Sequence, residues 1–218
     1  YIFCVIEKLR SLTGLGIARA ENMADNTANS DALVEVSGIL KAHAHNLIKI
    51  SQDLRLLHFM HEISLPAVQT GSSVMPGKIN PVISEAVMQC GMKVIANDYL
   101  ITEACSRASL QLNEFLPVVS FALLESLGIL CRCNEMFQKH IRGICADREI
   151  CETRTLSDPT LITAFLPVIG YEKGAEYARE YTRSGFATMK EFMYTKLDKE
   201  TVDTLLSPYS ITGLGYKA

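Results

Sequence analysis

The stretch "DALVEVSGILKAHAHNLIKISQDLRLL", residues 31–57, decides the expected fold. Its apolar side chains recur every three or four positions, which places them along one side of an α-helix. Ser30 or Asp31 could cap the start of this helix, because a short oxygen-bearing side chain accepts hydrogen bonds from free backbone N–H groups. A long helix with one apolar seam is typical of a helix bundle. The predicted seam contains Leu33, Val36, Leu40, Leu47, Ile50, Leu54 and Leu57, with His43 in the same stripe.

Two more long helices are predicted further along the chain. One covers about 81–104, because the ring of Pro81 breaks the preceding structure and suits a first helical turn. The other covers about 116–143, with Pro117 near its start, and is apolar on several sides. Such a helix has to be buried inside a bundle or between subunits. Its apolar residues are Leu116, Val119, Phe121, Leu123, Leu124, Leu127, Ile129 and Leu130.

The chain changes character from about Asp147. The predicted helices become shorter, and convincing strand or hairpin signals are not found. We therefore predict an all-α chain with two domains: residues 1–146 form part of a long-helix bundle, and residues 147–218 form a small C-terminal helical domain. Helix breakers recur in this second part at Pro159, Pro167, Gly170, Gly185 and Pro208.

Composition narrows the class of protein. The 218 residues are 48% hydrophobic and carry a net charge of −3, so no strong field for nucleic acid or an anionic membrane is expected. The seven cysteines are odd in number and lack framework spacing, which indicates free thiols in a reducing compartment such as the cytoplasm. The apolar stretch 115–131 contains Glu125 and is interpreted as a core helix, not a membrane span. No signal peptide is visible, and a start at Tyr1 suggests a piece of a longer protein.

The segment "GSSVMPGKINP", residues 71–81, holds more chemistry than a turn between two helices needs. Small residues at its start let backbone amides converge into an anion-binding nest. Lys78 adds a positive charge and Asn80 a directional amide donor, which together suit a carboxylate-bearing substrate. A serine oxyanion is a strong base that is stable only beside such donors. The same donors could stabilise the aci-carboxylate left when a proton is taken beside a carboxylate. The alternative is a plain polar helix–helix loop.

This segment resembles the GSSxMPxKxN signature of the fumarase/aspartase superfamily, with every fixed position present. The likeness continues on both sides, in "DLRLL", "EISLPAVQTG", "NPVISEAV", "VIANDYLI", "LQLNEFLPV" and "FLPVIGYEKGAEYARE". Within the superfamily, "LQLN" and "ADREICE" resemble aspartate ammonia-lyases more than class II fumarases. The resemblance implies the second half of the superfamily's central helical domain, followed by its small C-terminal domain.

The resemblance also implies roles for residues. Ser72 would be the base that removes the Cβ proton of L-aspartate, giving fumarate and ammonia without an organic cofactor. The substrate carboxylates would be contacted by Ser73, Lys78 and Asn80. Supporting roles would fall to Glu85, which orients a group of another subunit, and to Gly71 and Gly77, which permit loop movement.

The resemblance further implies a homotetramer acting on a small dicarboxylate, because the family assembles each site from three signature segments on three subunits. Only the third segment is present here. A class II fumarate hydratase, which expels water in place of ammonia, and a non-catalytic helical oligomerisation fragment stay open as alternatives.

One departure from the family pattern lies before the signature loop. Between "LRLL" and "HEISLP" the family has a longer stretch with a Ser-Gly-Pro-Arg run, whereas only His58, Phe59 and Met60 intervene here. His58 and His61, spaced i, i+3, could bind a metal on a helix face, but we predict no metal site.

Overall fold

The computed structural model describes residues 1–69, 71, 74, 75 and 77–213. Two short helices, α1 (Ile2–Thr13) and α2 (Met23–Ala28), precede three long ones, α3 (Asp31–Phe59), α4 (Val82–Cys105) and α5 (Leu116–Ile141). Shorter helices follow from residue 148. In the described ranges the only strands are two of two residues each, so the prediction of an all-α chain is confirmed. The bounds predicted for the long helices agree with the observed ones to within about two residues.

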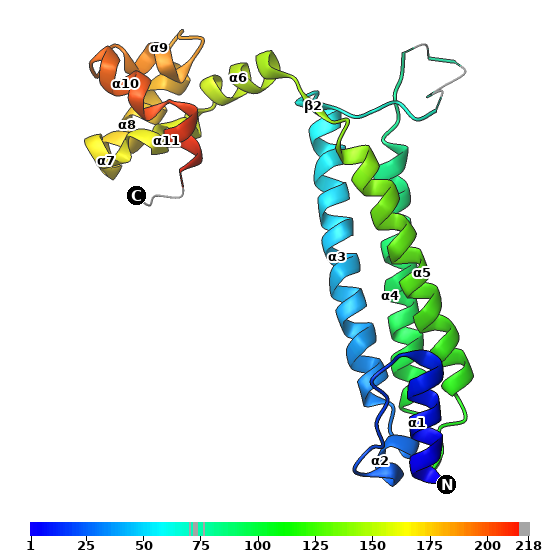
Figure 1. Cartoon of the computed structure of the whole chain (residues 1–218). Helices are drawn as coiled ribbons and strands as arrows, with labels where there is room; N and C mark the ends of the chain where they lie inside the picture. Colours follow the sequence, from blue (N-terminus) through cyan, green and yellow to red (C-terminus); the bar gives the residue numbers. More distant parts are fainter. Residues whose placement is uncertain (70, 72–73, 76, 214–218) are drawn as a thin grey trace. The chain divides into compact units, whose positions relative to one another are not determined.

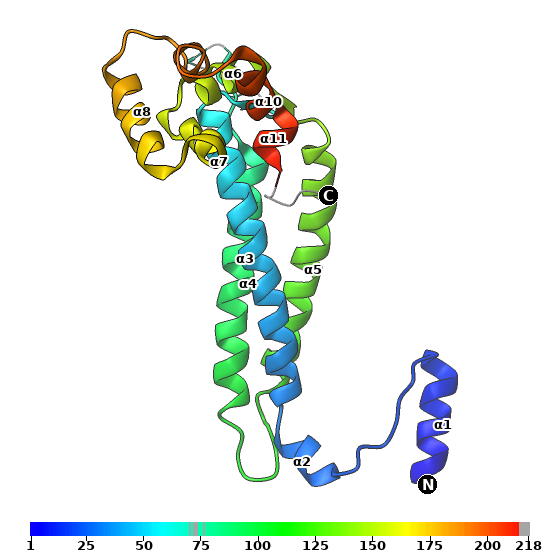
Figure 2. The same cartoon turned by 90° about the vertical axis from the view of Figure 1, so that its left-hand side faces the viewer.

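The three long helices lie side by side, with α4 between the other two (Figures 1 and 2). α4 packs along both α3 and α5, whereas α3 and α5 contact each other little. The largest core cluster of this bundle joins all three helices and consists of Ala44, Leu47, Val87, Val94, Leu130, Cys133 and Phe137. A second cluster, toward the far end of α4, consists of Ile101, Ala104, Val119 and Ala122.

The buried seam of α3 differs from the predicted one. Val36 and Ile50 are exposed, and the fully buried positions are Ser37, Ala44, Leu47 and Ser51. Small residues allow the two backbones to approach closely: a Cβ placed on Gly91 of α4 would lie 2.6 Å from Ile48 Cγ1. Three of the four buried side chains of α3 are accordingly small, and Leu47 is the large one.

Two buried polar networks fix the register of the bundle. Ser37 Oγ donates to Asp98 Oδ1 at 2.8 Å, and Lys41 Nζ donates to Asp98 Oδ2 at 2.6 Å, which ties α3 to α4. On the other side of α4, Asn97 Nδ2 donates to Ser126 Oγ at 3.0 Å and to Glu125 Oε2 at 2.8 Å. A sliding of one helix along another would leave these buried groups unpaired, which is costly.

The chain consists of two compact units. The first contains residues 1–59 and 65–144, and the second contains residues 60–64 and 145–218. The short strands β1 (Ile63–Ser64) and β2 (Cys145–Ala146) pair antiparallel, with Ile63 opposite Ala146. This pairing was not predicted, because two residues are too few to show a strand period. The division into independent domains at 146/147 stays a prediction.

The second unit consists of short helices around its own core. They are α6 (Arg148–Ser157), the 3₁₀ helix η1 (Pro159–Phe165), α7 (Leu166–Ile169), α8 (Tyr171–Arg183), α9 (Met189–Met193), α10 (Lys199–Leu205) and α11 (Pro208–Thr212). Side-chain caps explain several of the starts: Asp147 accepts from Ile150 N at 3.0 Å, and Asp198 accepts from Thr201 N at 2.8 Å. The core gathers around Phe165, Met189, Phe192, Met193 and Val202.

A buried histidine near the end of α5 makes stability depend on pH. The side chain of His140 is buried, and burial lowers its pKa from 6.5 because the charged imidazolium loses solvation. In the unfolded chain the ring takes up a proton near pH 6.5, whereas the folded protein resists it. We therefore expect the melting temperature to fall as the pH drops below 6.5, and His140→Phe to flatten this dependence. Thermal unfolding of both proteins across this range measures the effect, and parallel curves would contradict it.

Candidate functional site

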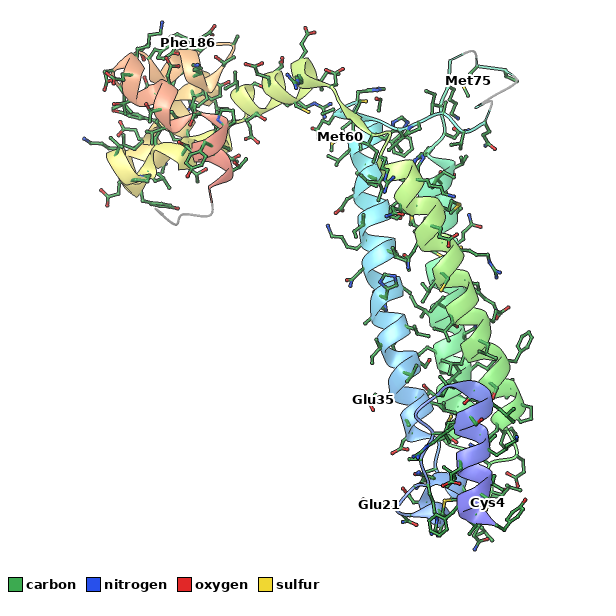
Figure 3. All side chains as sticks on the ribbon, viewed as in Figure 1. Cys4, Glu21, Glu35, Met60, Met75 and Phe186 are labelled. Carbon is green, nitrogen blue, oxygen red and sulfur yellow. The ribbon has the colours of Figure 1, made fainter. Side chains whose placement is uncertain are left out.

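The signature loop, residues 71–81, connects the segment after β1 to the start of α4. Of its residues, the structure describes Gly71, Val74, Met75 and 77–81; Met75 is labelled in Figure 3. The predicted base, Ser72, and the predicted carboxylate contact, Ser73, lie outside the described residues. Their roles stay predictions.

The two arms of the loop are joined at a narrow neck. Asn80 Nδ2 donates a hydrogen bond to Gly71 O at 2.7 Å. A Cβ built on Gly71 would lie 1.5 Å from Lys78 O, so only glycine fits here without moving the backbone. Gly71 is therefore in contact with both Lys78, seven positions later in the sequence, and Asn80, nine positions later. We call this arrangement the loop neck.

A tight turn lies between the arms. Gly77 has φ +81°, a left-handed conformation that glycine adopts without a steric penalty. Lys78 N donates to Met75 O at 3.3 Å and closes the turn. Gly71 and Gly77 thus each have a structural reason to be glycine, a close backbone contact and a left-handed conformation. The loop movement inferred from these two glycines stays a prediction.

The polar groups of the loop neck suit an anion. Lys78 is exposed and has no ion-pair partner among the residues that the structure describes. Asn80 is half-buried and uses one amide hydrogen on Gly71, so its second N–H can donate elsewhere. The loop runs directly into α4, whose N-terminal end favours negative charge. Together these groups could bind a carboxylate.

Glu85, in the first turn of α4, pairs with an arginine of the same chain. Its Oε1 lies 3.6 Å from Arg55 Nη2, across the contact between α4 and α3. The resemblance implies that Glu85 orients a group of another subunit. That role stays a prediction. The observed pair anchors the first turn of α4, and hence the loop arm before it, to α3.

Two residues near this loop arm received no such role from the sequence. Arg55 Nη1 also donates to Gln52 Oε1 at 3.1 Å, which holds its guanidinium against α3. His58 Nε2 lies 3.4 Å from the carbonyl oxygen of Ile79, the residue between Lys78 and Asn80 in the sequence. It donates a hydrogen bond to this oxygen in the tautomer protonated at Nε2. Arg55 lies among the leucines of "DLRLL", and a charged residue within an apolar run is the sequence feature that could have indicated a role for it. The contact of His58 depends on tertiary structure and left no sequence signal.

The idea of a metal site on a helix face at His58 and His61 does not fit the structure. α3 ends at Phe59, and His61 lies in the following turn with φ +60°. The two rings therefore do not project from one helix. Within the described ranges, no group of three or more potential ligand side chains gathers to hold a metal ion.

Comparison with known proteins gives relatives along almost the whole chain. A family described as lyase matches residues 1–96. The aspartate ammonia-lyase of Helicobacter pylori is 39% identical over 215 residues, which cover 95% of this chain and 46% of that protein. This chain thus spans about half the length of the curated relatives it matches.

Solved structures show the same fold. The fumarate lyase:delta crystallin from Brucella melitensis has a TM-score of 0.87 and 37% identity, over 95% of this chain and 46% of that one. A class II fumarase from Schistosoma mansoni has a TM-score of 0.79 and 26% identity, over 94% and 46%. The resemblance carried by the signature loop therefore extends over the described helices as well. The chain belongs to the fumarase/aspartase superfamily of lyases.

Proposed function

We propose that the complete protein, meaning this chain with whatever precedes or follows it in the cell, is an aspartate ammonia-lyase. The reaction is the elimination of ammonia from L-aspartate to give fumarate. The observation that carries the proposal is the loop neck, which holds Lys78 and Asn80 against Gly71, the residue that precedes the two signature serines in the sequence. The named aspartate ammonia-lyases among the relatives support this choice of substrate.

In the proposed mechanism Ser72 acts as a base and takes the proton from Cβ of L-aspartate. The electron pair of that C–H bond is first delocalised into the neighbouring carboxylate as an aci-carboxylate. Ser73, Lys78 and Asn80 stabilise this dianion through hydrogen bonds and charge. The electrons then form the C=C bond as the C–N bond breaks, and ammonia leaves from the opposite face. The protein donors stabilise the carbanion, so this mechanism needs no organic cofactor.

A further part of the proposal is that this chain supplies only one of the segments of a site. The loop contributes a base, a cation and an amide, but the groups that recognise the amino group of the substrate are not among its residues. In the superfamily they come from two other signature segments, which this chain does not contain. The complete protein is therefore the form in which activity is to be assayed.

Lys78→Met is expected to weaken substrate binding and slow elimination. The ammonium meets carboxylate charge in both the ground state and the transition state, so its loss raises KM and lowers kcat. We expect kcat/KM to fall by roughly 100-fold or more, because a charge-assisted contact in a site of this kind contributes about 3 kcal/mol. Steady-state kinetics with L-aspartate measure both constants. A lowered kcat with unchanged KM would contradict the ground-state contact.

The class II fumarate hydratase reaction is the second candidate function. It uses the same base and the same type of intermediate but expels water from L-malate. The likeness to the Schistosoma mansoni class II fumarase favours it, although the identity of 26% is lower than that of the aspartate ammonia-lyases. The third candidate function is that of a non-catalytic helical oligomerisation module, which requires only that the bundle assembles.

We also propose that the protein self-associates, most simply as a homotetramer with dihedral symmetry. Among the described helices, α5 alone has the length and apolar character of a membrane span, and much of its apolar surface is not covered by this chain. Phe121 and Leu124 of α5 and Ile39 of α3 are each more than half exposed. Further helices in contact with these faces would remove their apolar surface from water. We infer a cytoplasmic protein with no membrane or nucleic-acid partner.

Light scattering at micromolar concentration tests this assembly. We expect a mass close to four chains, whereas Phe121→Glu together with Leu124→Glu, placed on the exposed face of α5, should shift the mass toward the monomer. Glu135→Gln, a charge change on the same helix at an exposed position, serves as control and should leave the mass unchanged. A folded, strictly monomeric protein would contradict the proposal.

A further inference from the structure

The last turns of α3 carry three polar side chains on one face. Ser51, Arg55 and His58 follow one another at the spacing i, i+4, i+7, which aligns them along the helix. This face meets the start of α4, where Arg55 Nη2 lies 3.6 Å from Glu85 Oε1. At the end of the face His58 Nε2 lies 3.4 Å from the carbonyl oxygen of Ile79, in the loop arm 78–81. His58 thus joins α3 to the loop arm.

The two ring nitrogens of His58 have different surroundings. Nδ1 is buried and has no hydrogen-bond partner among the described residues, whereas Nε2 faces the carbonyl oxygen of Ile79. A proton on Nδ1 would leave a buried donor unpaired and would also turn the bare Nε2 lone pair toward another acceptor. A proton on Nε2 leaves only the Nδ1 lone pair unpaired and forms the bond to Ile79. The surroundings therefore select the tautomer in which His58 donates to the loop arm.

Ile79 lies between the two side chains that are proposed, with Ser73, to bind the substrate carboxylates. Asn80 Nδ2 donates to Gly71 O at 2.7 Å, which joins the two arms of the loop to each other. The bond from His58 instead joins the arm to α3, a helix that contributes to the core of the bundle. The loop neck therefore holds the shape of the loop, and His58 holds its place on the bundle.

We propose that His58 is a positioning residue of the signature loop, which places Lys78 and Asn80 for the substrate carboxylates. It holds the backbone at Ile79, and the peptide units on either side carry the two binding side chains. The effect of this anchor on elimination rests on the proposed function, whereas the anchor itself does not. A hydrogen bond of ordinary net strength favours the anchored arm by roughly threefold to tenfold, and a catalytic group displaced by about 1 Å can lose on the order of 100-fold in rate.

Steady-state kinetics of the complete protein test the anchor with two substitutions. His58→Phe keeps an aromatic ring and removes the donor, so kcat/KM for L-aspartate should fall by roughly threefold to tenfold. His58→Gln carries an amide N–H at about the reach of Nε2 and should stay within about twofold of wild type. Equal losses in both variants would overturn the proposal, because a role in packing alone does not depend on the donor.

The matched controls are His45→Phe and His45→Gln, at an exposed position of the same helix. Both should retain the wild-type kcat/KM. A loss in His45→Phe as large as that in His58→Phe would overturn the proposal, because the added ring on α3, and not the missing bond to Ile79, would then account for the defect.

A double-mutant cycle shows whether His58 acts through the loop arm. If His58 works by placing Lys78, its loss has less to misplace once Lys78→Met has removed the ammonium. We therefore expect the fold-loss caused by His58→Phe to be smaller in the Lys78→Met protein than in wild type. The same fold-loss in both backgrounds would mean that His58 acts independently of Lys78, and the positioning role would be wrong.

Amide hydrogen exchange tests the anchor without catalysis. The amide of Lys78 bonds to Met75 O at 3.3 Å, and this turn should open more often when its arm is released from α3. We expect exchange at Lys78 to be at least about threefold faster in His58→Phe than in wild type, and unchanged in His58→Gln. The amide of Val94, in the core of α4, is the internal reference and should exchange alike in all three proteins. Identical exchange at Lys78 in the three proteins would overturn the proposal.

The two kinds of measurement separate this inference from the proposed function. Faster exchange at Lys78 in a His58→Phe protein whose wild type forms no fumarate would support the anchor and contradict the lyase function. Fumarate formation with unchanged exchange and unchanged kinetics in His58→Phe would support the lyase function and overturn the anchor.

Discussion

Ser72→Ala in the complete protein is expected to abolish elimination while leaving the protein folded and assembled. The substitution removes one hydroxyl, and the role proposed for that hydroxyl is proton abstraction, so the loss falls on that step. A positioned base contributes about 10²- to 10⁴-fold, and we expect kcat to fall by at least the lower value. Initial rates of fumarate formation give kcat, and light scattering gives the assembly.

The control for this variant is Ser120→Ala, which removes a hydroxyl from an exposed position of α5. It should keep the wild-type rate. Turnover of Ser72→Ala at the wild-type rate would refute the assignment of the base and, with it, the mechanism.

Gly71→Ala is expected to cause the second largest loss. The added Cβ would lie 1.5 Å from Lys78 O and 2.6 Å from the carbonyl carbon, so the loop neck has to open. Opening moves the arm that carries Lys78 and Asn80 away from Gly71, and a displacement of about 1 Å at a catalytic group can cost on the order of 100-fold in rate. The bundle core is untouched, so the melting temperature should stay within a few degrees of wild type.

Gly185→Ala is the matched control, because no described atom lies within 4 Å of the position that its Cβ would take. It should change neither rate nor stability. A Gly71→Ala protein with full activity would show that the loop neck does not position the reacting groups. A variant that unfolds would show that the neck is needed for the fold and would contradict the expected melting temperature.

The long helices could be predicted from the sequence because their apolar period is local and sustained. The burial of individual positions could not, as Val36 and Ala44 show. The prediction placed Val36 in the seam, but Val36 is exposed, whereas Ala44, whose carbonyl oxygen would lie 3.2 Å from a Cβ built on Gly91 of α4, is fully buried. Which face of an apolar helix meets its neighbour depends on the neighbour's shape.

The candidate site shows the same limit. A resemblance of motif identified Lys78 and Asn80, but the reason for glycine at Gly71 is a contact with a backbone seven residues away. Likewise, Arg55 and His58 reach the loop arm only through the packing of α3 against α4. Residue types and spacing can indicate a chemistry, whereas the contacts that hold the reacting groups in place depend on tertiary structure.

The central claim is tested most directly by following the ultraviolet absorbance of fumarate when the complete protein is given L-aspartate or L-malate. We predict that fumarate forms from L-aspartate, with release of an equal amount of ammonia, and at least tenfold more slowly from L-malate. Faster formation from L-malate would contradict the ammonia-lyase assignment and favour fumarate hydratase. Formation from neither substrate by a folded, assembled protein would contradict catalysis altogether and leave the helical oligomerisation module as the account of this chain.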